Sequence, residues 1–269
     1  MFQDNDQSLS AEQVMAGLQT DIIGRRVLFY PSVGSTNVIA KTKAAREADE
    51  GLVILADEQT AGRGRLGRRW DAPVGSSILM SILFRPDLPA SDAHLLTMVV
   101  SLAAIDGIGE VTGLQASLKW PNDVLVGGRK VGGILTESSF IGDRLDYAVV
   151  GLGLNVNFDP ADIAGIPPTA TSLMVLLGRP VDRLALVRAI LSVVDRRYRA
   201  LKAGHSPREE WSHNLSTIGR RVRVTWSRGV VEGVAEAVNR SGGLLVRRDE
   251  GSLAEIAVGD VTLLRDDAD

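Results

Sequence analysis

The hydrophobic and polar positions of this chain follow two different patterns. Up to about residue 214, short apolar runs alternate with longer segments whose apolar residues recur at helical spacing. From residue 215 the pattern changes to short segments of alternating apolar and polar residues, joined by glycine and asparagine turns. The first pattern predicts an α+β region with helices packed on a mixed β-sheet, and the second predicts a small β-barrel.

The individual runs give the expected elements of the larger region. Ser35-Thr36-Asn37 precedes an alanine-rich segment and predicts a helix cap. Helices are expected at 38–48, 93–105 and 181–203. Strands are expected at 27–30, 52–56, 77–84, 116–120, 131–140 and 145–156.

The two ends of the chain predict smaller units. Residues 1–25 hold one short amphipathic helix at most, with Ser10 and Gln13 in capping-box spacing. So short a segment is below the size of an independently stable domain, so we expect an extension and no DNA-binding domain. The expected division is an N-terminal extension at 1–25, a large domain at 26–214 and a β-barrel domain at 215–269, with barrel strands at 221–226, 230–238, 244–248 and 253–264.

Composition excludes several classes of function. The 269 residues hold 30 Lys+Arg against 33 Asp+Glu, so no broad basic surface for nucleic acid is expected. The absence of cysteine excludes disulfides, thiolate metal sites and cysteine nucleophiles. The polar start MFQDNDQS does not resemble a secretory signal, and the nearly apolar stretch 95–105 is shorter than the roughly 20 residues of a membrane span. A cytoplasmic protein without membrane contact is therefore expected.

One loop concentrates positive charge in this slightly acidic chain. Residues 62–69, Gly-Arg-Gly-Arg-Leu-Gly-Arg-Arg, follow an apolar strand-like run and form what we call the Arg-Gly loop. Glycines allow close approach to the main chain, and arginines offer forked donors that suit carboxylate and phosphate oxygens. The alternative is a solvated loop or one that touches nucleic acid. The charge balance favours a small, multiply charged ligand.

Three further segments carry candidate ligand-binding residues. Lys119-Trp120-Pro121-Asn122-Asp123 ends a strand, where ligand contacts are common, although Pro-Asn-Asp is also ordinary turn chemistry. Residues 127–133 place Lys130 on a glycine-flanked hairpin, where a lysine is usually solvated. Residues 151–157, Gly-Leu-Gly-Leu-Asn-Val-Asn, alternate glycine with leucine, which favours close approach by a ligand or another backbone.

Read together and in order, these segments resemble one family, the biotin protein ligases, which are relatives of the lipoate ligases and more distantly of class II tRNA synthetases. The resemblance runs from about residue 35 to 157 and weakly onward. It implies a class II synthetase-like mixed sheet with flanking helices, plus an SH3-like C-terminal barrel. The segments that carry it are 35–37, 58–70, 119–123, 129–137 and 151–157.

The resemblance implies a two-step reaction. Biotin and MgATP would give biotinyl-5′-AMP and pyrophosphate, and a lysine on the biotin carboxyl carrier domain of an acyl-CoA carboxylase would then take the biotinyl group. ATP, Mg²⁺ and biotin are the expected ligands, with Mg²⁺ bound mainly through ATP phosphates, no protein metal site and no tightly bound prosthetic group. A monomer or weak homodimer that binds no DNA is expected.

Residue roles follow from the resemblance and from this chemistry. Attack of a carboxylate on a triphosphate brings like charges together, so cations and in-line positioning should dominate catalysis. Lys130, Arg63 and Arg65 are the expected cations, with Lys130 between the biotin carboxylate and the α-phosphate, and Asp123 could assist deprotonation of the acceptor lysine. The expected biotin-binding residues are Ser35, Thr36, Asn37, Gln59, Gly62, Arg63, Arg65, Lys130, Gly132 and Gly133. The expected nucleotide-binding residues are Arg63, Arg65, Leu66, Gly67, Arg68, Trp70, Lys119, Asn122, Lys130 and Asn155.

Two other functions stay open at this point. A lipoate or octanoate ligase or transferase would share the fold and the lysine, although the polar set at 35–37 and Gln59 favours a ureido ring over a plain acyl chain. A biotin-sensing regulator is the non-enzymatic alternative. Leu66 stands where some relatives carry a charged or polar residue, and the Arg-Gly loop and residues 161–171 are expected to order when the adenylate binds.

Overall fold

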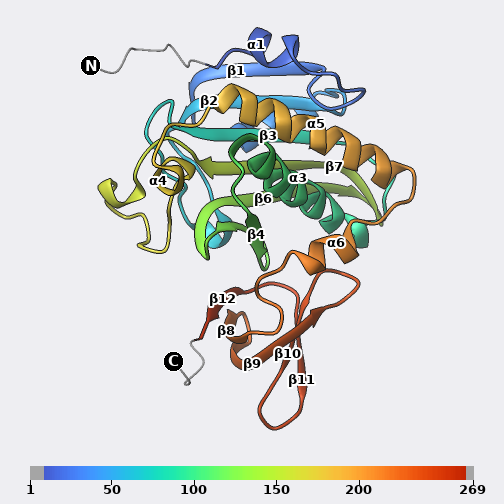
Figure 1. Ribbon diagram of the computed structural model, residues 1–269. Helices are drawn as coiled ribbons and strands as arrows, with labels where there is room; N and C mark the ends of the chain where they lie inside the picture. The colour runs from blue at the N-terminus through green and yellow to red at the C-terminus, as the bar shows by residue number, and fades with distance from the viewer. Residues whose placement is uncertain (1–8, 265–269) are drawn as a thin grey trace.

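A computed structural model describes residues 9–264, which form two units joined through a short helix (Figure 1). The larger unit contains a seven-stranded sheet with the order β1-β2-β3-β7-β6-β5-β4. β1 and β2 run parallel, and the other neighbours are antiparallel. The expected α+β class is confirmed. The strands are β1 (Arg26–Val33), β2 (Leu52–Gln59), β3 (Ser77–Phe84), β4 (Ala116–Lys119), β5 (Asp123–Val126), β6 (Arg129–Ile141) and β7 (Arg144–Asn155).

Helices cover both faces of this sheet because its central strands are apolar on both sides. In β2, Val53 and Leu55 belong to the main core, whereas Leu52 and Ile54 pack into a smaller cluster with helix α2. Helices α3 and α5 pack together on the main-core face, and α1 lies beside β1 (Figure 1). The helices are α1 (Ala11–Ala16), α2 (Thr36–Ala44), α3 (His94–Thr112), α4 (Leu173–Leu177), α5 (Arg183–Lys202) and α6 (Arg208–His213).

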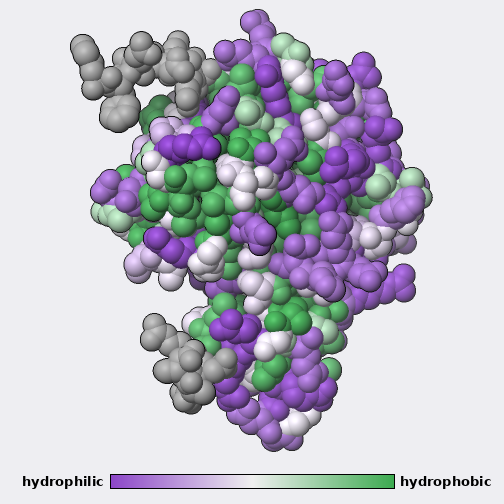
Figure 2. All heavy atoms as spheres, in the orientation of Figure 1, coloured by the Kyte–Doolittle hydropathy of each residue, from purple (hydrophilic) through white to green (hydrophobic). Residues whose placement is uncertain are grey.

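The smaller unit is a five-stranded antiparallel sheet with the order β11-β10-β9-β8-β12. Alternate residues of its strands, among them Val222, Val224 and Val246, are fully buried, as the alternating pattern predicted. Hydrophilic side chains dominate its outer end (Figure 2). Its strands are β8 (Arg221–Trp226), β9 (Gly229–Val238), β10 (Leu244–Arg247), β11 (Leu253–Ile256) and β12 (Asp260–Leu263).

The two units contact each other through β4 and the residues that follow it. Leu118 N–H donates to Asn214 O at 2.8 Å, and Ser216 N–H donates to Leu118 O at 2.8 Å. The buried Trp120 donates its indole N–H to Gly242 O at 2.9 Å. These bonds hold the C-terminal sheet against the end of β4 (Figure 1).

Most expected elements are present, with three differences. β5 and α4 were not expected, and the expected strand 253–264 is divided into β11 and β12. The expected helix 38–48 begins two residues earlier and ends at Ala44. The outermost parts of the expected extension and barrel, residues 1–8 and 265–269, lie outside the described residues.

Helix α3 requires a correction to the argument about membrane spans. With the turn before it, it covers Ala90–Thr112, 23 residues that are long and apolar enough to cross a membrane by length and composition. The sequence analysis considered only residues 95–105, which are shorter than the helix. Gly107 and Gly109 do not end the helix, which continues to Thr112 and is capped by Gly113. Most of the helix is buried against α5 and the sheet, as in the core helix of a soluble protein.

Candidate active site

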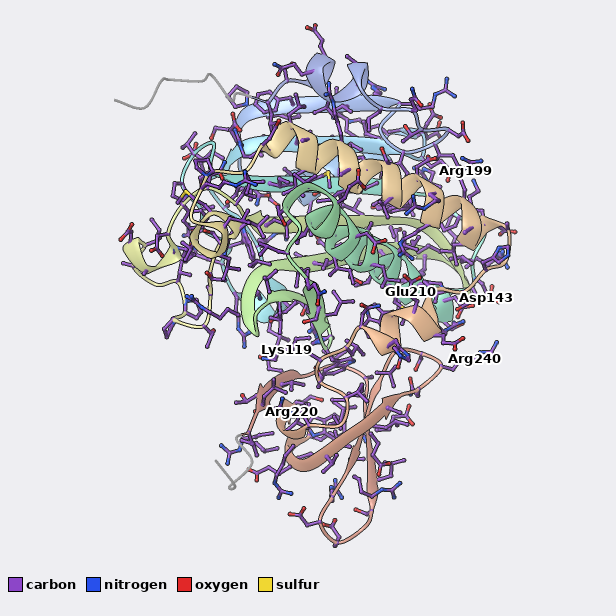
Figure 3. The ribbon with its side chains drawn as sticks, viewed as in Figure 1. Lys119, Asp143, Arg199, Glu210, Arg220 and Arg240 are labelled. Carbon is purple, nitrogen blue, oxygen red and sulfur yellow. The ribbon has the colours of Figure 1, made fainter. Side chains whose placement is uncertain are left out.

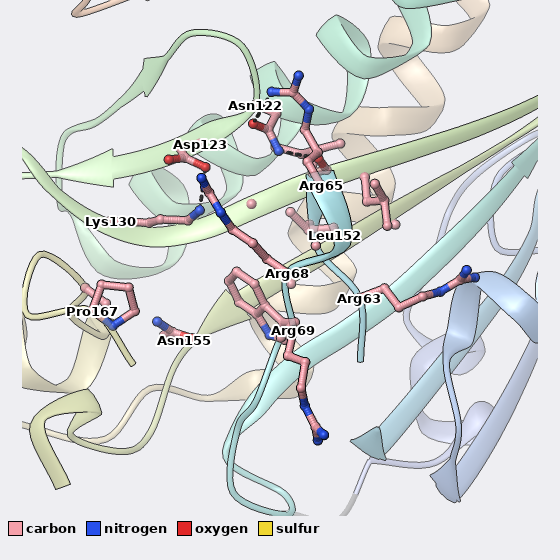
Figure 4. A pocket seen from close by; sticks show the side chains of 18 of the residues that line it. Arg63, Arg65, Arg68, Arg69, Asn122, Asp123, Lys130, Leu152, Asn155 and Pro167 are labelled. Carbon is pink, nitrogen blue, oxygen red and sulfur yellow. Dashed lines mark hydrogen bonds and ion pairs between the residues drawn. The ribbon is translucent and has the colours of Figure 1, made fainter. Parts of the chain in front are cut away.

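A cavity of about 370 Å³ opens at the end of the sheet where β2, β6 and β7 carry polar residues. This volume lies within the range typical of small-molecule sites. The Arg-Gly loop lies over it, and its other walls come from the start of α2, β4 to β7, residues 165–170 and β12 (Figure 4). The expected residues on its wall are Ser35, Thr36, Asn37, Gln59, Arg63, Arg65, Arg68, Trp70, Lys119, Asn122, Asp123, Lys130, Gly133 and Asn155.

Four expected residues do not line this cavity. Gly62, Leu66 and Gly67 line a wider cavity of about 700 Å³ on the other side of the Arg-Gly loop. Gly132 lies between strands, where a Cβ would overlap with Leu154. Gly132, which was expected to bind biotin, therefore allows close packing of β6 on β7 and does not line the cavity.

Lys130 is held by both its main chain and its side chain. Its Nζ donates to Asp123 Oδ1 at 2.5 Å across the β5–β6 pair. Its backbone N–H donates to Thr169 O at 3.0 Å, and its carbonyl accepts from Thr171 N–H at 2.8 Å. The loop after β7 therefore fixes the backbone of Lys130, while Asp123 directs its ammonium group along the cavity wall.

The Arg-Gly loop supplies two cations on the Lys130 side. Arg65 donates to Asn122 Oδ1 at 3.2 Å, and Arg68 extends toward Asp123 and Lys130 and pairs with Asp260 of β12 (Figure 4). Burial lowers the pKa of the Arg65 guanidinium, and nearby Asp260 and Asp123 partly oppose this effect. A desolvated cation binds an anion more strongly than a hydrated one.

Lys119 is a further cation on the Lys130 side of the cavity. It lies at the junction of the two units (Figure 3). Burial lowers the pKa of its ammonium group, the Asp123 carboxylate raises it, and the charge of Lys130 lowers it further. An anion bound between Lys119 and Lys130 would relieve this repulsion.

Arg63 departs from its expected position. Its guanidinium points away from Lys130 (Figure 4) and lies 3.4 Å from Glu137 Oε2. The structure therefore gathers Arg65, Arg68 and Lys119 around Lys130, and leaves Arg63 at the side of the cavity near Asn37.

The polar end of the cavity is built at the start of α2. Thr36 donates both its backbone N–H, at 2.8 Å, and its hydroxyl, at 3.1 Å, to Gln59 Oε1. Ser35 precedes the helix, but its side chain makes no capping hydrogen bond. Ser35 thus occupies the N-cap position that the sequence predicted, while its hydroxyl makes no hydrogen bond to the helix end.

Trp70 lies across the backbone of the central strands. A Cβ on Gly153 would be 2.6 Å from the Trp70 ring, and one on Gly133 would be 3.4 Å from it. Lys130 Nζ lies 5.8 Å from the ring centroid. The indole Nε1 is buried and has no hydrogen-bond partner among residues 9–264. Trp70 thus lies beside the cavity, with the nitrogen edge of its ring packed against the backbone of Gly153.

Sequence reasoning missed the wall that the C-terminal unit supplies. Asp260, Val261 and Thr262 of β12 line the cavity, as do residues 165–170. The alternating pattern of β12 identifies a strand but not its distant neighbour in space. The repeated prolines and glycine at 165–168 were the only local signal for the second wall.

The arrangement suits a ligand with three chemically different parts. Hydroxyl and amide groups lie at one end, an indole ring and glycine backbone form a flat surface, and Lys119, Lys130, Arg65 and Arg68 surround an anionic position. Within the part of the chain that the structure describes, there is no group of three or more His, Cys, Asp or Glu side chains that could hold a metal ion.

Comparison with known proteins agrees with this geometry. Residues 29–155 match the Biotin/lipoate A/B protein ligase family, and residues 217–264 match the Biotin protein ligase C terminal domain. The bifunctional ligase/repressor BirA of Bacillus subtilis is 35% identical over 258 residues, which cover 95% of this chain and 79% of that protein. A biotin–[acetyl-CoA-carboxylase] ligase of Mycobacterium tuberculosis is 32% identical over 97% of this chain and 96% of its own.

A solved structure extends the similarity to the fold. The biotin protein ligase from Aquifex aeolicus in complex with biotin and ATP aligns with a TM-score of 0.70 and 28% identity. The alignment covers 90% of this chain and 100% of that one. Both units of the present chain therefore have counterparts in known proteins.

Proposed function

The chain belongs to the biotin protein ligase family, and we propose that it joins biotin to a carrier-domain lysine of an acyl-CoA carboxylase in two steps. It is an ATP-dependent ligase. A biotin carboxylate oxygen attacks the α-phosphorus of ATP, the bond to the bridging oxygen breaks, and biotinyl-5′-AMP and pyrophosphate form. The acceptor amine then attacks the carbonyl carbon, AMP leaves, and an amide bond remains.

The position of Lys130 is the observation that carries this proposal. It has a fixed backbone, a carboxylate partner and three neighbouring cations, and its Nζ lies 5.8 Å from the centroid of the Trp70 ring. A lysine is a compact point charge, so it can serve the carboxylate and the α-phosphate as bonds shift. Charge that develops in the transition state is stabilised most by such preorganised groups.

The other residues divide between the two substrates. Ser35, Thr36 and Gln59 would bind the ureido ring of biotin, because their hydroxyl and amide groups match its donors and acceptor. Trp70, Asn122 and Asn155 would hold the adenosine, and Arg65, Arg68 and Lys119 the phosphates. Arg63, now turned toward Glu137, would need to rotate to reach either ligand.

In the second step, Asp123 would accept a proton from the acceptor lysine. The acceptor lysine has an ordinary pKa near 10.4 and must lose a proton before its amine attacks. Asp123 holds Lys130 at 2.5 Å in the free enzyme. Once an anionic adenylate competes for Lys130, the Asp123 carboxylate becomes available to the incoming ammonium group.

The finer points of the assignment are proposals on the same basis. Mg²⁺ would enter with the ATP phosphates and offset their charge. Residues 26–214 would form the catalytic domain and 215–269 the C-terminal domain, after an extension at 1–25. The enzyme would work in the cytoplasm, where ATP is supplied, as a monomer or weak homodimer.

Transfer of labelled biotin tests the function. Purified enzyme, biotin and MgATP are incubated with a biotin carrier domain, and wild type is compared with Lys130→Ala. We expect robust labelling by wild type and a loss of about 100-fold or more in the variant, the scale of removing one electrostatic group from a transition state. Lys43→Ala, which changes a partly exposed lysine of α2 outside the cavity, serves as a matched control and should keep wild-type activity.

The same assay addresses the neighbouring activity. If wild type labels the carrier with lipoate or octanoate and not with biotin, the protein is an acyl ligase and the present assignment is wrong. Equal labelling by wild type and Lys130→Ala would instead leave the function standing and remove Lys130 from its proposed role.

A further inference from the structure

A second cavity adjoins the ligand cavity, and we propose that it is the docking surface for the acceptor protein, with Leu66 as its main apolar contact. This outer cavity, of about 700 Å³, is lined by the Arg-Gly loop, the start of α3, part of β6 and the turn between β11 and β12. The inference rests on the proposed function, because the occupant is the protein that carries the acceptor lysine.

The two cavities adjoin along the Arg-Gly loop. Arg63, Arg65 and Arg68 of this loop line both of them, and so do Asn122 and Ile134. A lysine carries its amine at the end of a flexible four-carbon stem. The acceptor lysine of a protein docked in the outer cavity can therefore extend past the loop to an adenylate bound in the inner one.

Leu66 holds a backbone conformation that is unfavourable for a leucine. Its φ is 55° and its ψ is 36°, in the left-handed region that bulky side chains rarely adopt and that glycine adopts without strain. Leu66 is 64% exposed, so packing within the chain offsets little of this strain. Strained residues of this kind cluster at functional contacts. We therefore infer that the side chain is retained for a partner that covers it.

The other apolar residues of the outer cavity come from both units of the molecule. Val258, in the turn between β11 and β12, lines the cavity and is 54% exposed. Met98, Ile134 and Trp211 also line it and are almost fully buried, so they form an apolar floor. Exposed apolar side chains grouped around such a floor are typical of a protein interaction site. The docking surface thus includes the C-terminal unit.

The charge of the outer cavity indicates the chemistry of the partner. Among the described residues, its lining contains four arginines and one carboxylate, namely Arg63, Arg65, Arg68, Arg69 and Glu137. His94 adds no charge near neutral pH, because burial lowers the pKa of its imidazole. A positively charged surface favours an acidic partner. The occupant that fits is a carrier domain with an acidic surface and apolar side chains beside its acceptor lysine.

Transfer kinetics with Leu66→Ala test the proposal. Preformed biotinyl-5′-AMP is mixed with the enzyme, and transfer to a biotin carrier domain is measured as a function of carrier concentration. We expect the KM for the carrier to rise about 10-fold, the lower end of what burial of one leucine side chain contributes. Val258→Ala should raise this KM in the same direction. ATP–pyrophosphate exchange, which needs no acceptor, should keep its wild-type rate in both variants.

Two charged variants test the acidic character of the partner. Leu66→Lys and Leu66→Glu both remove the apolar contact, but they add charges of opposite sign. The KM for the carrier should rise more in Leu66→Glu than in Leu66→Lys, and the difference should narrow at high salt because ions screen exposed charges. Equal KM values for the two variants at low salt would overturn the assignment of an acidic partner.

Val74→Ala is the matched control for the loss of an exposed apolar side chain. Val74 is 65% exposed and lines neither cavity, so the KM for the carrier should stay at the wild-type value. Leu66→Gly separates docking from folding, because it removes the side chain and the backbone strain together. It should unfold at no lower urea concentration than wild type, while its KM for the carrier rises as in Leu66→Ala.

The possible outcomes are distinct. A wild-type KM for the carrier in both Leu66→Ala and Val258→Ala overturns the docking surface and leaves the proposed function standing. If these variants keep that KM but change the sedimentation of the protein, the surface belongs to a contact with a second copy of this chain, and the proposal is also wrong. If wild type shows no biotin-dependent ATP–pyrophosphate exchange, the proposed function fails and this inference fails with it.

Discussion

Trp70 owes its position to two residues that have no side chain. Gly153 and Gly133 let the indole ring lie against the backbone of β7 and β6, within reach of Lys130. A flat aromatic surface beside a cation suits a nucleotide, whose base is flat and whose phosphates are anionic. The alternating glycines of residues 151–153 indicated that a ligand or another backbone approaches this strand closely. In the structure, the group that approaches is the side chain of Trp70.

We predict that Gly153→Ala displaces Trp70 and weakens the adenylation step. The added Cβ would lie 2.6 Å from the ring, which is closer than atoms can approach. A shift of about 1 Å near a reacting centre can cost about 100-fold, so we expect a rate at least about 10-fold lower in ATP–pyrophosphate exchange. Gly109→Ala, on the partly exposed side of α3, should leave this rate at the wild-type value. Equal rates for both variants would contradict the role given to Trp70.

The candidate residues differ in how far sequence could identify them. Lys130 and the Arg-Gly loop stand out because cations between glycines are uncommon in an acidic chain. Ser81 could not be found in this way, since residues 77–84 are apolar apart from two serines and predict only a buried strand. The hydrogen bonds of its hydroxyl to Thr36 and Asn37 depend on helix α2, which only folding brings next to β3. The placement of Arg63 near Glu137 was missed for the same reason.

The Arg-Gly loop is held at both ends by one buried ion pair. Arg183, at the start of α5, donates to Asp57 Oδ1 at 2.8 Å and to Ser77 O at 3.1 Å. Asp57 lies near the end of β2 and Ser77 at the start of β3, so Arg183 joins the two strands from which the loop departs. Only 3% of the Arg183 side chain is exposed, so the Asp57 carboxylate pairs with a guanidinium that is almost entirely shielded from water.

We predict that Asp57→Asn destabilises the protein by about 3–5 kcal/mol, because it removes a carboxylate that accepts a hydrogen bond from a buried guanidinium. Urea unfolding at neutral pH measures this loss. The exposed pair Arg223–Glu232 supplies the control, and Glu232→Gln should change the free energy of unfolding by less than about 1 kcal/mol. Similar small losses for the two variants would show that the buried pair does not stabilise the loop ends.

Long elements were easier to predict than short ones. β3 and the body of α5 follow directly from their apolar spacing, and their bounds agree closely with expectation. β5 has only four residues and follows a Pro-Asn turn, so its pattern was read as part of that turn. The division between β11 and β12 at residues 257–259 was missed because an apolar residue, Val258, continues the alternation there while remaining exposed.

At the scale of the whole molecule, one cavity depends on both units. Lys119 ends β4, Asp260 begins β12, and Arg68 of the Arg-Gly loop pairs with Asp260. The family resemblance predicted a C-terminal domain, but the residues of that domain did not indicate what it does. The folded chain indicates a role, because β12 forms part of the cavity wall. The Asp260 carboxylate of β12 pairs with Arg68, a cation that would otherwise be free to bind a phosphate.

We predict that adenylate binding orders the Arg-Gly loop and residues 161–171. A mixed anhydride is easily hydrolysed, so the site should close around it, and both segments have the glycines or prolines and the exposure expected of such covers. Hydrogen–deuterium exchange with and without biotinyl-5′-AMP should show stronger protection at both. Amides of β8, outside the cavity, should exchange equally in the two states. Unchanged exchange in the Arg-Gly loop would rule out closure.

The place of β12 also bears on how the protein should be handled. This strand forms part of the cavity wall and ends at Leu263, so an affinity tag or fluorescent protein joined directly after Leu263 would begin beside the ligand cavity. Helix α1, by contrast, lies beside β1 at the opposite edge of the large sheet (Figure 1). Tags for purification or proximity labelling should therefore be joined before α1 and not directly after β12.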